Sequence, residues 1–315
     1  MTRQPLTIGI AAALAAGLLW GLVFVAPLLL PDYPATLLTF GRYVAFGLVT
    51  PPIAWWQRDA MRRLTRGDWW MAVKLSIVGN IIYYLALSAA IQLAGAPLPT
   101  LIIGTLPVVI AVCSNFGERQ FSWLKLLPSL ALIGLGLLCV NADQLARLDA
   151  RGALTAYVMG AGLAVVANAA WTWYPIHNAR WLKANPEHTS TTWASAQGIA
   201  TLPMAVVGLS VSIAYLQATG DARFATSVCG PEPMKFWLLM LAIGFGASWL
   251  GTLLWNIASK NTPTALTGQL IVFETLAALG YAYLVYRRAP SLTEMAGISL
   301  LMLGVIVGVR ALSRR

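Results

Sequence analysis

Charged residues are scarce in this sequence. Of its 315 residues, Asp, Glu, Lys and Arg make up only 10%, whereas hydrophobic residues make up 58%. A soluble domain of this size carries about a quarter charged residues, because its surface must face water. With a mean hydropathy of +0.72, this shortage excludes a soluble globular protein and predicts an integral membrane protein.

Cysteine and histidine are also rare. The three cysteines, Cys113, Cys139 and Cys229, lie far apart, and no CxxC pair or His/Cys cluster with the spacing of metal ligands occurs. The sequence therefore predicts neither a disulfide framework nor a metal site. It also lacks a GxxxxGK[ST] run, so ATP does not drive this protein through its own chain, and we expect no cofactor.

The net charge of +10 could indicate a nucleic-acid partner. The basic residues, however, lie in short stretches between apolar segments, where the positive-inside rule explains them better. If the N-terminus is cytoplasmic, fourteen of the 21 Lys and Arg residues fall on that side and six on the other, with Arg42 inside an apolar segment. We therefore predict that both termini are cytoplasmic, and we expect no nucleic-acid partner.

Long apolar runs dominate the sequence. About twenty helical residues cross the roughly 30 Å hydrocarbon core of a bilayer. The first run continues without a polar cleavage region, which favours a span over a signal peptide. The segments predicted to be membrane-spanning helices are 7–29, 35–56, 70–93, 98–116, 123–141, 153–176, 190–216, 235–258, 264–285 and 291–311.

The two halves of the sequence repeat. The run PTLIIGTL that begins at Pro99 recurs as PTALTGQL at Pro263, with four of eight residues identical, and Trp20 corresponds to Trp171. The matching runs open the fourth and the ninth segment. Because each half has five segments, an odd number, the second copy is inverted in the membrane relative to the first. We therefore predict an all-α membrane protein with ten transmembrane helices in two inverted five-helix repeats, residues 1–150 and 151–315.

Several short motifs resemble those of the drug/metabolite transporter superfamily, EamA type. They are Trp20-Gly21 in the first segment, Arg42 in the second, Pro107 with Gly117-Glu118-Arg119 in the fourth, Gly134 and Gly136 in the fifth, and Phe273-Glu274 in the ninth. Within the superfamily, the chain most resembles the YddG-type exporters of aromatic amino acids in bacterial inner membranes. The sequence departs from the family where Tyr286-Arg287-Arg288 replaces a Gly-Glu element.

Arg42 and Glu274 are charged residues deep inside apolar segments. A charge at that depth costs several kcal/mol unless protein or water solvates it. Counting residues places both near the bilayer midplane, so the two could grip the ends of a zwitterionic solute. The alternative is a structural role, in which they pair or bond to backbone carbonyls and only hold helices together.

Aromatic residues well inside the segments alternate with amides and hydroxyls at helical spacing. Such a lining can stack on an aromatic solute and bond its polar groups, although packing between helices is an equally good explanation for any one of them. The substrate-binding residues predicted in this way are Trp20, Arg42, Asn80, Tyr83, Tyr84, Asn168, Trp171, Trp249, Asn256, Gln269 and Glu274. Pro107 and Pro175 are predicted hinges.

These features predict a transporter rather than an enzyme. We expect an inner-membrane, multi-pass secondary transporter that exports aromatic amino acids and related zwitterionic metabolites by alternating access. Segments one, three, four, six, eight and nine are expected to line its cavity, with five and ten packed together behind it. A multidrug or sugar-nucleotide carrier is the alternative, and a lipid-modifying enzyme is disfavoured because Glu274 has no second carboxylate at its depth. We expect a small-molecule substrate, membrane lipid around the protein, and a monomer or weak homodimer.

Overall fold

The computed structural model describes residues 3–106, 109, 127–146, 151–225, 230–262 and 270–313. Within these residues the chain is helical and contains no strand. Six helical segments are long and apolar enough to cross a membrane, namely Leu6–Leu29, Ala35–Trp56, Arg66–Ala94, Leu154–Ala184, Ser190–Ala218 and Pro233–Asn261.

The helices of the first half follow the predicted segments closely. They are α1 (Arg3–Gly21), η1 (Leu22–Phe24), α2 (Ala26–Leu29), α3 (Ala35–Trp56), α4 (Arg58–Arg62), α5 (Arg66–Leu75), η2 (Ser76–Ile82), α6 (Tyr83–Ala94), α7 (Pro97–Gly104) and α9 (Leu127–Ala146). The third segment begins four residues earlier than hydropathy predicts. The cause is a capping box, in which the side chain of Thr65 accepts from the amide of Asp68 and the Asp68 carboxylate accepts from the amide of Thr65.

The second half contains α10 (Arg151–Ala184), α11 (Ser190–Ala218), α12 (Ala222–Ala225), α13 (Pro233–Ile243), η4 (Gly244–Leu250), α14 (Gly251–Asn261), α16 (Val272–Tyr286) and α17 (Leu292–Ser313). Helix α10 runs eight residues beyond its predicted end. Its last turns are polar in sequence but buried in part, since Asn178 and Leu182 are 0% and 1% exposed.

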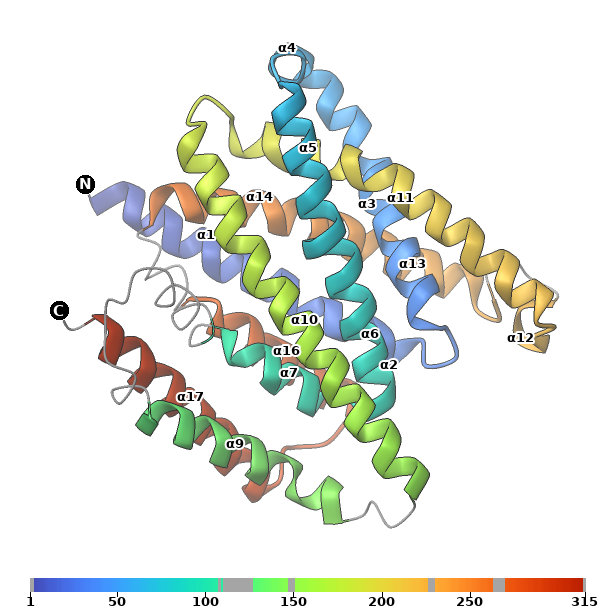
Figure 1. Cartoon of the computed structure of the whole chain (residues 1–315), viewed down its shortest axis with the longest axis vertical. Coiled ribbons are helices and arrows are strands. Elements are labelled where there is room, and N and C mark those ends of the chain that lie inside the picture. The colour runs from blue at the N-terminus through green and yellow to red at the C-terminus, as the bar shows by residue number, and fades with distance from the viewer. Residues whose placement is uncertain are drawn as a thin grey trace.

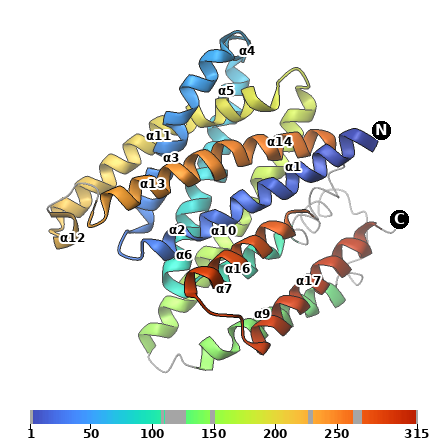
Figure 2. The same ribbon diagram turned by 180° about the vertical axis from the view of Figure 1, so that it is seen from behind.

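The helices pack in a defined set of pairs. Helix α3 lies along α11, α6 along α10, and α1 along α14 and α16. Helices α9 and α17 lie side by side at one edge of the molecule (Figure 2). Their close approach depends on glycine: a Cβ on Gly136 would lie 2.7 Å from the carbonyl oxygen of Gly297. The prediction that the fifth and tenth segments pack together is confirmed.

Two of the long helices contain a π-helical stretch. Segment η2 separates α5 from α6, and η4 separates α13 from α14. In η4 the hydroxyl of Ser248 donates to the carbonyl of Ile243, five residues earlier, at 3.3 Å. A π-helical turn is wider than an α-helical one and occurs often at functional sites.

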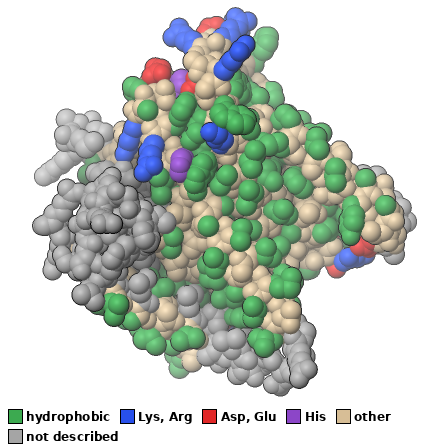
Figure 3. All heavy atoms as spheres, viewed as in Figure 1, with side chains coloured by type: hydrophobic (Ala, Val, Ile, Leu, Met, Phe, Trp, Pro, Cys, Tyr) green, Lys and Arg blue, Asp and Glu red, His purple; other side chains and the backbone are tan. Residues whose placement is uncertain are grey.

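The two opposite ends of the molecule differ in charge. The start of α1, the end of α17, helix α4 and the turn between α10 and α11 lie on one side, and α12 lies on the opposite side (Figure 1). Lys and Arg side chains gather over α4, where Arg58, Arg62, Arg63 and Arg66 are exposed, and a largely hydrophobic surface separates this end from α12 (Figure 3). We call the side that carries α4 the basic end.

Candidate functional site

A polar cavity lies where the interrupted helices meet. It is narrow, with a cavity volume of about 10 Å³. The cavity is thus closed around space for about one water. Its lining consists of Trp20, Val23, Arg42, Tyr43, Gly79, Asn80, Tyr83, Trp171, Tyr174, Ala247, Ser248, Thr252 and Glu274.

Arg42 enters the cavity from α3 and is only 4% exposed. Its Nε donates to the hydroxyl of Ser248 in η4 at 2.9 Å. The guanidinium carbon lies 4.3 Å from the ring centre of Tyr84 and 4.9 Å from that of Tyr43, so two aromatic faces support the charge. Nη1 of Arg42 is buried and has no hydrogen-bond partner among the described residues.

Glu274 enters the cavity from the first turn of α16 and is 1% exposed. Its Oε2 accepts a hydrogen bond of 3.3 Å from the indole nitrogen of Trp171. Its Oε1 is buried without a partner among the described residues, and so is the hydroxyl of Tyr83. Arg42 and Glu274 form no ion pair within 4.0 Å, although both line the cavity. A direct Arg42–Glu274 bridge between helices is therefore not what keeps the two charges inside.

Four aromatic side chains close the cavity. Trp171 stacks on Tyr83 with ring centres 4.5 Å apart and on Tyr174 at 5.1 Å. Trp20 meets Trp171 edge to face at 4.9 Å. Each such pair contributes roughly 0.5–1.5 kcal/mol beyond its buried area. The rings pack on one another and leave the polar atoms of Arg42 and Glu274 at the edges of a narrow space.

The structure brings six of the predicted binding residues to this cavity: Trp20, Arg42, Asn80, Tyr83, Trp171 and Glu274. Tyr84 lies just behind the lining, where its ring supports Arg42 and its hydroxyl donates to the carbonyl of Val23 at 3.2 Å. These residues come from both halves of the chain. The first half contributes α1, α3 and the continuous helix of η2 and α6, and the second half contributes α10 and α16.

Three other predicted residues lie away from the cavity. The amide of Asn168 donates to the carbonyl of Ile102 at 2.6 Å and to the hydroxyl of Thr105 at 2.8 Å, which joins α10 to the end of α7. Trp249 stacks on Phe245, with ring centres 5.9 Å apart, and donates to Ser195 at 3.4 Å. Asn256 accepts from the amide of Asn178 at 2.9 Å. Each of these polar groups is satisfied by another helix.

The remaining predictions concern prolines and the ninth segment. Pro107 and Gln269 lie outside the described residues. Pro175 lies inside α10, where its missing N–H leaves the carbonyl of Trp171 without the usual helical partner. Among the described lining residues, α3 contributes, so the expected set of lining segments was wrong in leaving out the second. Much of the fourth segment lies outside the described residues, and its expected contribution stays a prediction.

Sequence reasoning missed Tyr43, Tyr174 and Ser248. Tyr174 lies three residues after Trp171 and therefore on the same face of α10. Ser248 precedes Thr252 and Asn256 at intervals of four, a spacing that carries the polar face of α14 back into η4. Extending the face of Asn168 and Trp171 by one turn would have found Tyr174. Extending the face of Thr252 and Asn256 by one turn would have found Ser248.

Comparisons with known proteins bear on the whole chain. Residues 7–142 match the model of the EamA-like transporter family. The chain is 46% identical over 307 residues to "Inner membrane protein YtfF" of Escherichia coli (strain K12), an alignment that covers 96% of this chain and 95% of the relative. A solved crystal structure of a protein with 17% identity aligns over the full length of both chains with a TM-score of 0.62, which indicates a shared fold.

Proposed function

Because this chain belongs to the EamA-like transporter family, we propose that it is an inner-membrane secondary transporter that exports aromatic amino acids and related zwitterionic metabolites. The inner-membrane location follows the name of its Escherichia coli relative. The substrate is the one that the resemblance to YddG-type exporters implies, and the chemistry of the cavity supports it.

One observation carries the substrate proposal. The cavity presents one basic and one acidic side chain, each with a buried atom that has no hydrogen-bond partner among the described residues: Nη1 of Arg42 and Oε1 of Glu274. Buried charged groups normally find partners, because leaving one unpaired costs about 1–3 kcal/mol or more. A zwitterionic amino acid supplies both partners at once, its carboxylate to Arg42 and its ammonium group to Glu274.

The aromatic lining favours an aromatic side chain on the substrate. Trp171 already stacks on two tyrosines, and a flat ring inserted between them would keep the same kind of contact. A space for about one water cannot hold phenylalanine, so the conformation described here is closed. Substrate binding then requires the rings of Trp20, Trp171 and Tyr83 to separate as the helices around them move.

The pattern of neighbouring helices supports two repeats, residues 1–150 and 151–315, related by inversion. In the numbering of the ten predicted segments, the third packs on the sixth (α6 on α10) and the eighth packs on the first (α14 on α1). Likewise, η2 of the third segment contacts α11 of the seventh segment. The equivalent contact in the other half is that of η4, in the eighth segment, with α3, in the second. Exchanging the halves reproduces each contact, as a two-fold relation between repeats requires. Because each half has five predicted spans, an odd number, we place that axis in the membrane plane.

The hinge proposed at Pro175 lies next to the cavity, one residue after the lining residue Tyr174. Pro175 frees the carbonyl of Trp171, and the two π-helical segments contribute Gly79, Asn80, Ala247 and Ser248 to the lining. Pro107 is kept as a third hinge from the sequence. We place the basic end, and with it both termini, in the cytoplasm. The protein needs no second copy to complete this cavity and acts as a monomer or in a weak homodimer.

Counterflow in proteoliposomes tests this function. Proteoliposomes are loaded with unlabelled phenylalanine, ethidium or a UDP-sugar, and the accumulation of the same solute in labelled form is measured with and without a pH gradient. We expect counterflow of phenylalanine alone. Counterflow of ethidium would point to a multidrug exporter, counterflow of the UDP-sugar would point to a nucleotide-sugar carrier, and either result without phenylalanine transport overturns the proposal.

A further inference from the structure

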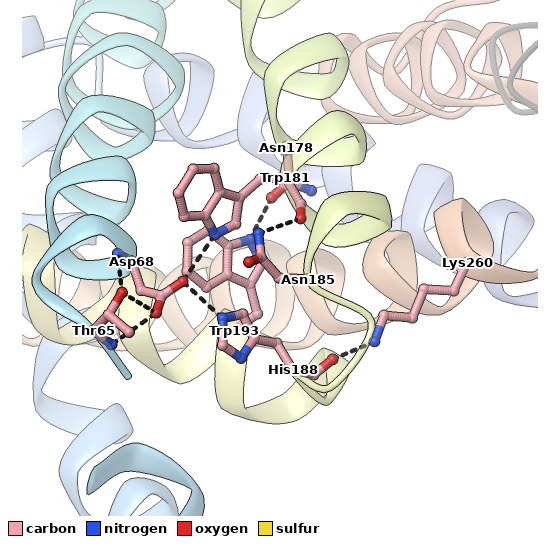
Figure 4. Close-up of polar contacts among 8 residues, drawn as sticks. All are labelled: Thr65, Asp68, Asn178, Trp181, Asn185, His188, Trp193 and Lys260. Atoms are coloured by element: carbon pink, nitrogen blue, oxygen red, sulfur yellow. Dashed lines mark hydrogen bonds and ion pairs between the residues drawn. The ribbon is translucent and has the colours of Figure 1, made fainter. Parts of the chain in front are cut away.

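Another buried ionisable side chain, Asp68, lies at the basic end, away from the cavity. The carboxylate of Asp68, in the first turn of α5, accepts four hydrogen bonds (Figure 4). Oδ2 accepts from the amide and the hydroxyl of Thr65, both at 2.7 Å. Oδ1 accepts from the indole nitrogen of Trp181 at 3.1 Å and from Nε2 of His188 at 2.7 Å. Since a carboxylate only accepts, Nε2 of His188 carries the proton.

These contacts join four helical segments that are distant in sequence. Asp68 belongs to α5, Trp181 to the last turns of α10, and His188 to the turn before α11. Lys260, near the end of α14, donates to the carbonyl of His188. The ring of Trp193 in α11 stacks on His188 with ring centres 6.0 Å apart and on Trp181 at 6.2 Å. Asp68 and His188 are 2% and 8% exposed.

A continuous polar face of α10 connects this cluster with the cavity. Trp171, Tyr174, Asn178 and Trp181 follow one another at intervals of three or four residues, so they share one face over about 15 Å. The first two line the cavity, and the last binds Asp68. We call these four residues the α10 seam.

Side chains of α11 and α14 fill the space beside the α10 seam. The hydroxyl of Tyr174 donates to Gln197 at 2.9 Å, and the amide of Gln197 donates to Asn178 at 3.3 Å. Asn178 also accepts from Trp193 at 2.7 Å. Gln197, Asn178 and Trp193 are all at most 1% exposed. A row of polar groups thus runs from the cavity to the basic end and is closed along its length by hydrogen bonds between helices.

We propose that the α10 seam is the closed half of the solute path towards the basic end, and that the cluster around Asp68 is the latch that keeps it closed. This inference rests on the proposed transport function. Asp68 and His188 are then positioning residues: they touch no solute and instead set whether α5 is held against the turn between α10 and α11. Solute passage on this side requires α5 to move away from that turn. This movement breaks the hydrogen bonds of Asp68 with Trp181 and His188. The hydrogen bonds between Asp68 and Thr65 are kept, because both residues belong to the capping box of α5.

The latch is tested by the accessibility of a cysteine in the cavity, measured from each side of the membrane. In a variant in which Cys113, Cys139 and Cys229 are replaced by alanine, Thr252→Cys places a thiol of similar size on the cavity lining. The rate of its modification by a membrane-impermeant methanethiosulfonate reagent is measured in vesicles of both orientations. We then add Asp68→Asn, which leaves one acceptor oxygen where the carboxylate has two, or the milder Trp181→Phe and His188→Gln.

We expect Asp68→Asn to raise the modification rate at least tenfold from the basic end and to leave or lower the rate from the other end. If Asp68→Asn does not fold, Trp181→Phe and His188→Gln carry the test, with a smaller rise on the same side. Asp221→Asn is the matched control, because it removes the exposed pair of Asp221 with Arg223 (2.7 Å) before α12, and it should leave both rates unchanged. Equal rates from both sides, or no change from the basic end, overturns the latch.

The same vesicles separate this inference from the proposed function. A one-sided change in accessibility without phenylalanine counterflow would retain the latch and reject the proposed substrate. Phenylalanine counterflow with no one-sided change in any of the three variants would retain the substrate and reject the latch.

Discussion

The side chain of Arg42 donates from Nε to the hydroxyl of Ser248 at 2.9 Å, and this bond joins α3 of the first half to the π-helical segment of the second. The guanidinium is thereby held against Tyr43 and Tyr84 while Nη1 stays without a partner among the described residues. We propose that this buried cation, fixed on one side and unpaired on the other, receives the anionic group of the solute.

Ser248→Ala should lower the free energy of unfolding by about 1–3 kcal/mol, because it leaves Nε of a buried cation unpaired. The measurement is thermal or denaturant unfolding of the purified protein in detergent. Ser212→Ala is the control: its hydroxyl bonds only to the carbonyl of Gly208 in its own helix at 2.7 Å, so we expect a change of less than about 0.5 kcal/mol. Equal stability of the two variants would mean that Ser248 does not hold Arg42.

Two glycines of α9 that are two residues apart in sequence should differ sharply in their tolerance of alanine. A Cβ on Gly136 would lie 2.7 Å from a carbonyl oxygen and 2.8 Å from an amide nitrogen of α17, whereas a Cβ on Gly134 would meet nothing within 4 Å. Gly136→Ala should therefore lower stability by about 1–3 kcal/mol through overpacking. Gly134→Ala should be neutral or slightly stabilising, since alanine favours the helix. Similar melting temperatures for the two variants would contradict the packing of α9 on α17.

Trp171 should matter through its ring more than through its nitrogen. Trp171→Phe retains a ring to stack on Tyr83 and Tyr174, whereas Trp171→Leu loses both stacked pairs. At roughly 0.5–1.5 kcal/mol for each pair, Trp171→Leu should be about 1–3 kcal/mol less stable than Trp171→Phe. Trp70→Leu serves as control, because Trp70 is 61% exposed and its loss should cost far less. Indistinguishable Phe and Leu variants at position 171 would show that the stack does not stabilise the closed cavity.

Much of the fold could be predicted from the sequence because the bilayer imposes one length on every span. The segment 35–56 coincides with α3 to the residue, and the family resemblance based on Arg42 and Phe273-Glu274 is confirmed by the family match. Hydropathy failed where a helix continues in polar residues. The capping box depends on hydrogen bonds between Thr65 and Asp68, and the buried end of α10 depends on those of Trp181 and Asn178 with other helices. A hydropathy average does not see either set.

The site could be predicted only in part. Arg42 and Glu274 were identifiable because a charge in an apolar span must face protein or water. Asn168, Asn256 and Trp249 carry the same sequence signal as Asn80 and Tyr83, yet they do not line the cavity. Which polar residue faces the cavity depends on the rotation of each helix, and the π-helical segments η2 and η4 change that rotation midway.

The most direct test of the central claim is counterflow of labelled phenylalanine by the wild type, Glu274→Gln and Arg42→Gln, with phenethylamine and phenylpropionate as competitors. These competitors lack the carboxylate and the ammonium group, respectively. A hydrogen bond to a charged group is worth about 1.5–3 kcal/mol, and each 1.4 kcal/mol is tenfold. We expect each variant to raise the KM for phenylalanine roughly 10- to 100-fold while remaining folded, and each competitor to inhibit the wild type weakly. Phenylalanine transport by a folded Glu274→Gln variant with the KM and rate of the wild type would contradict the account.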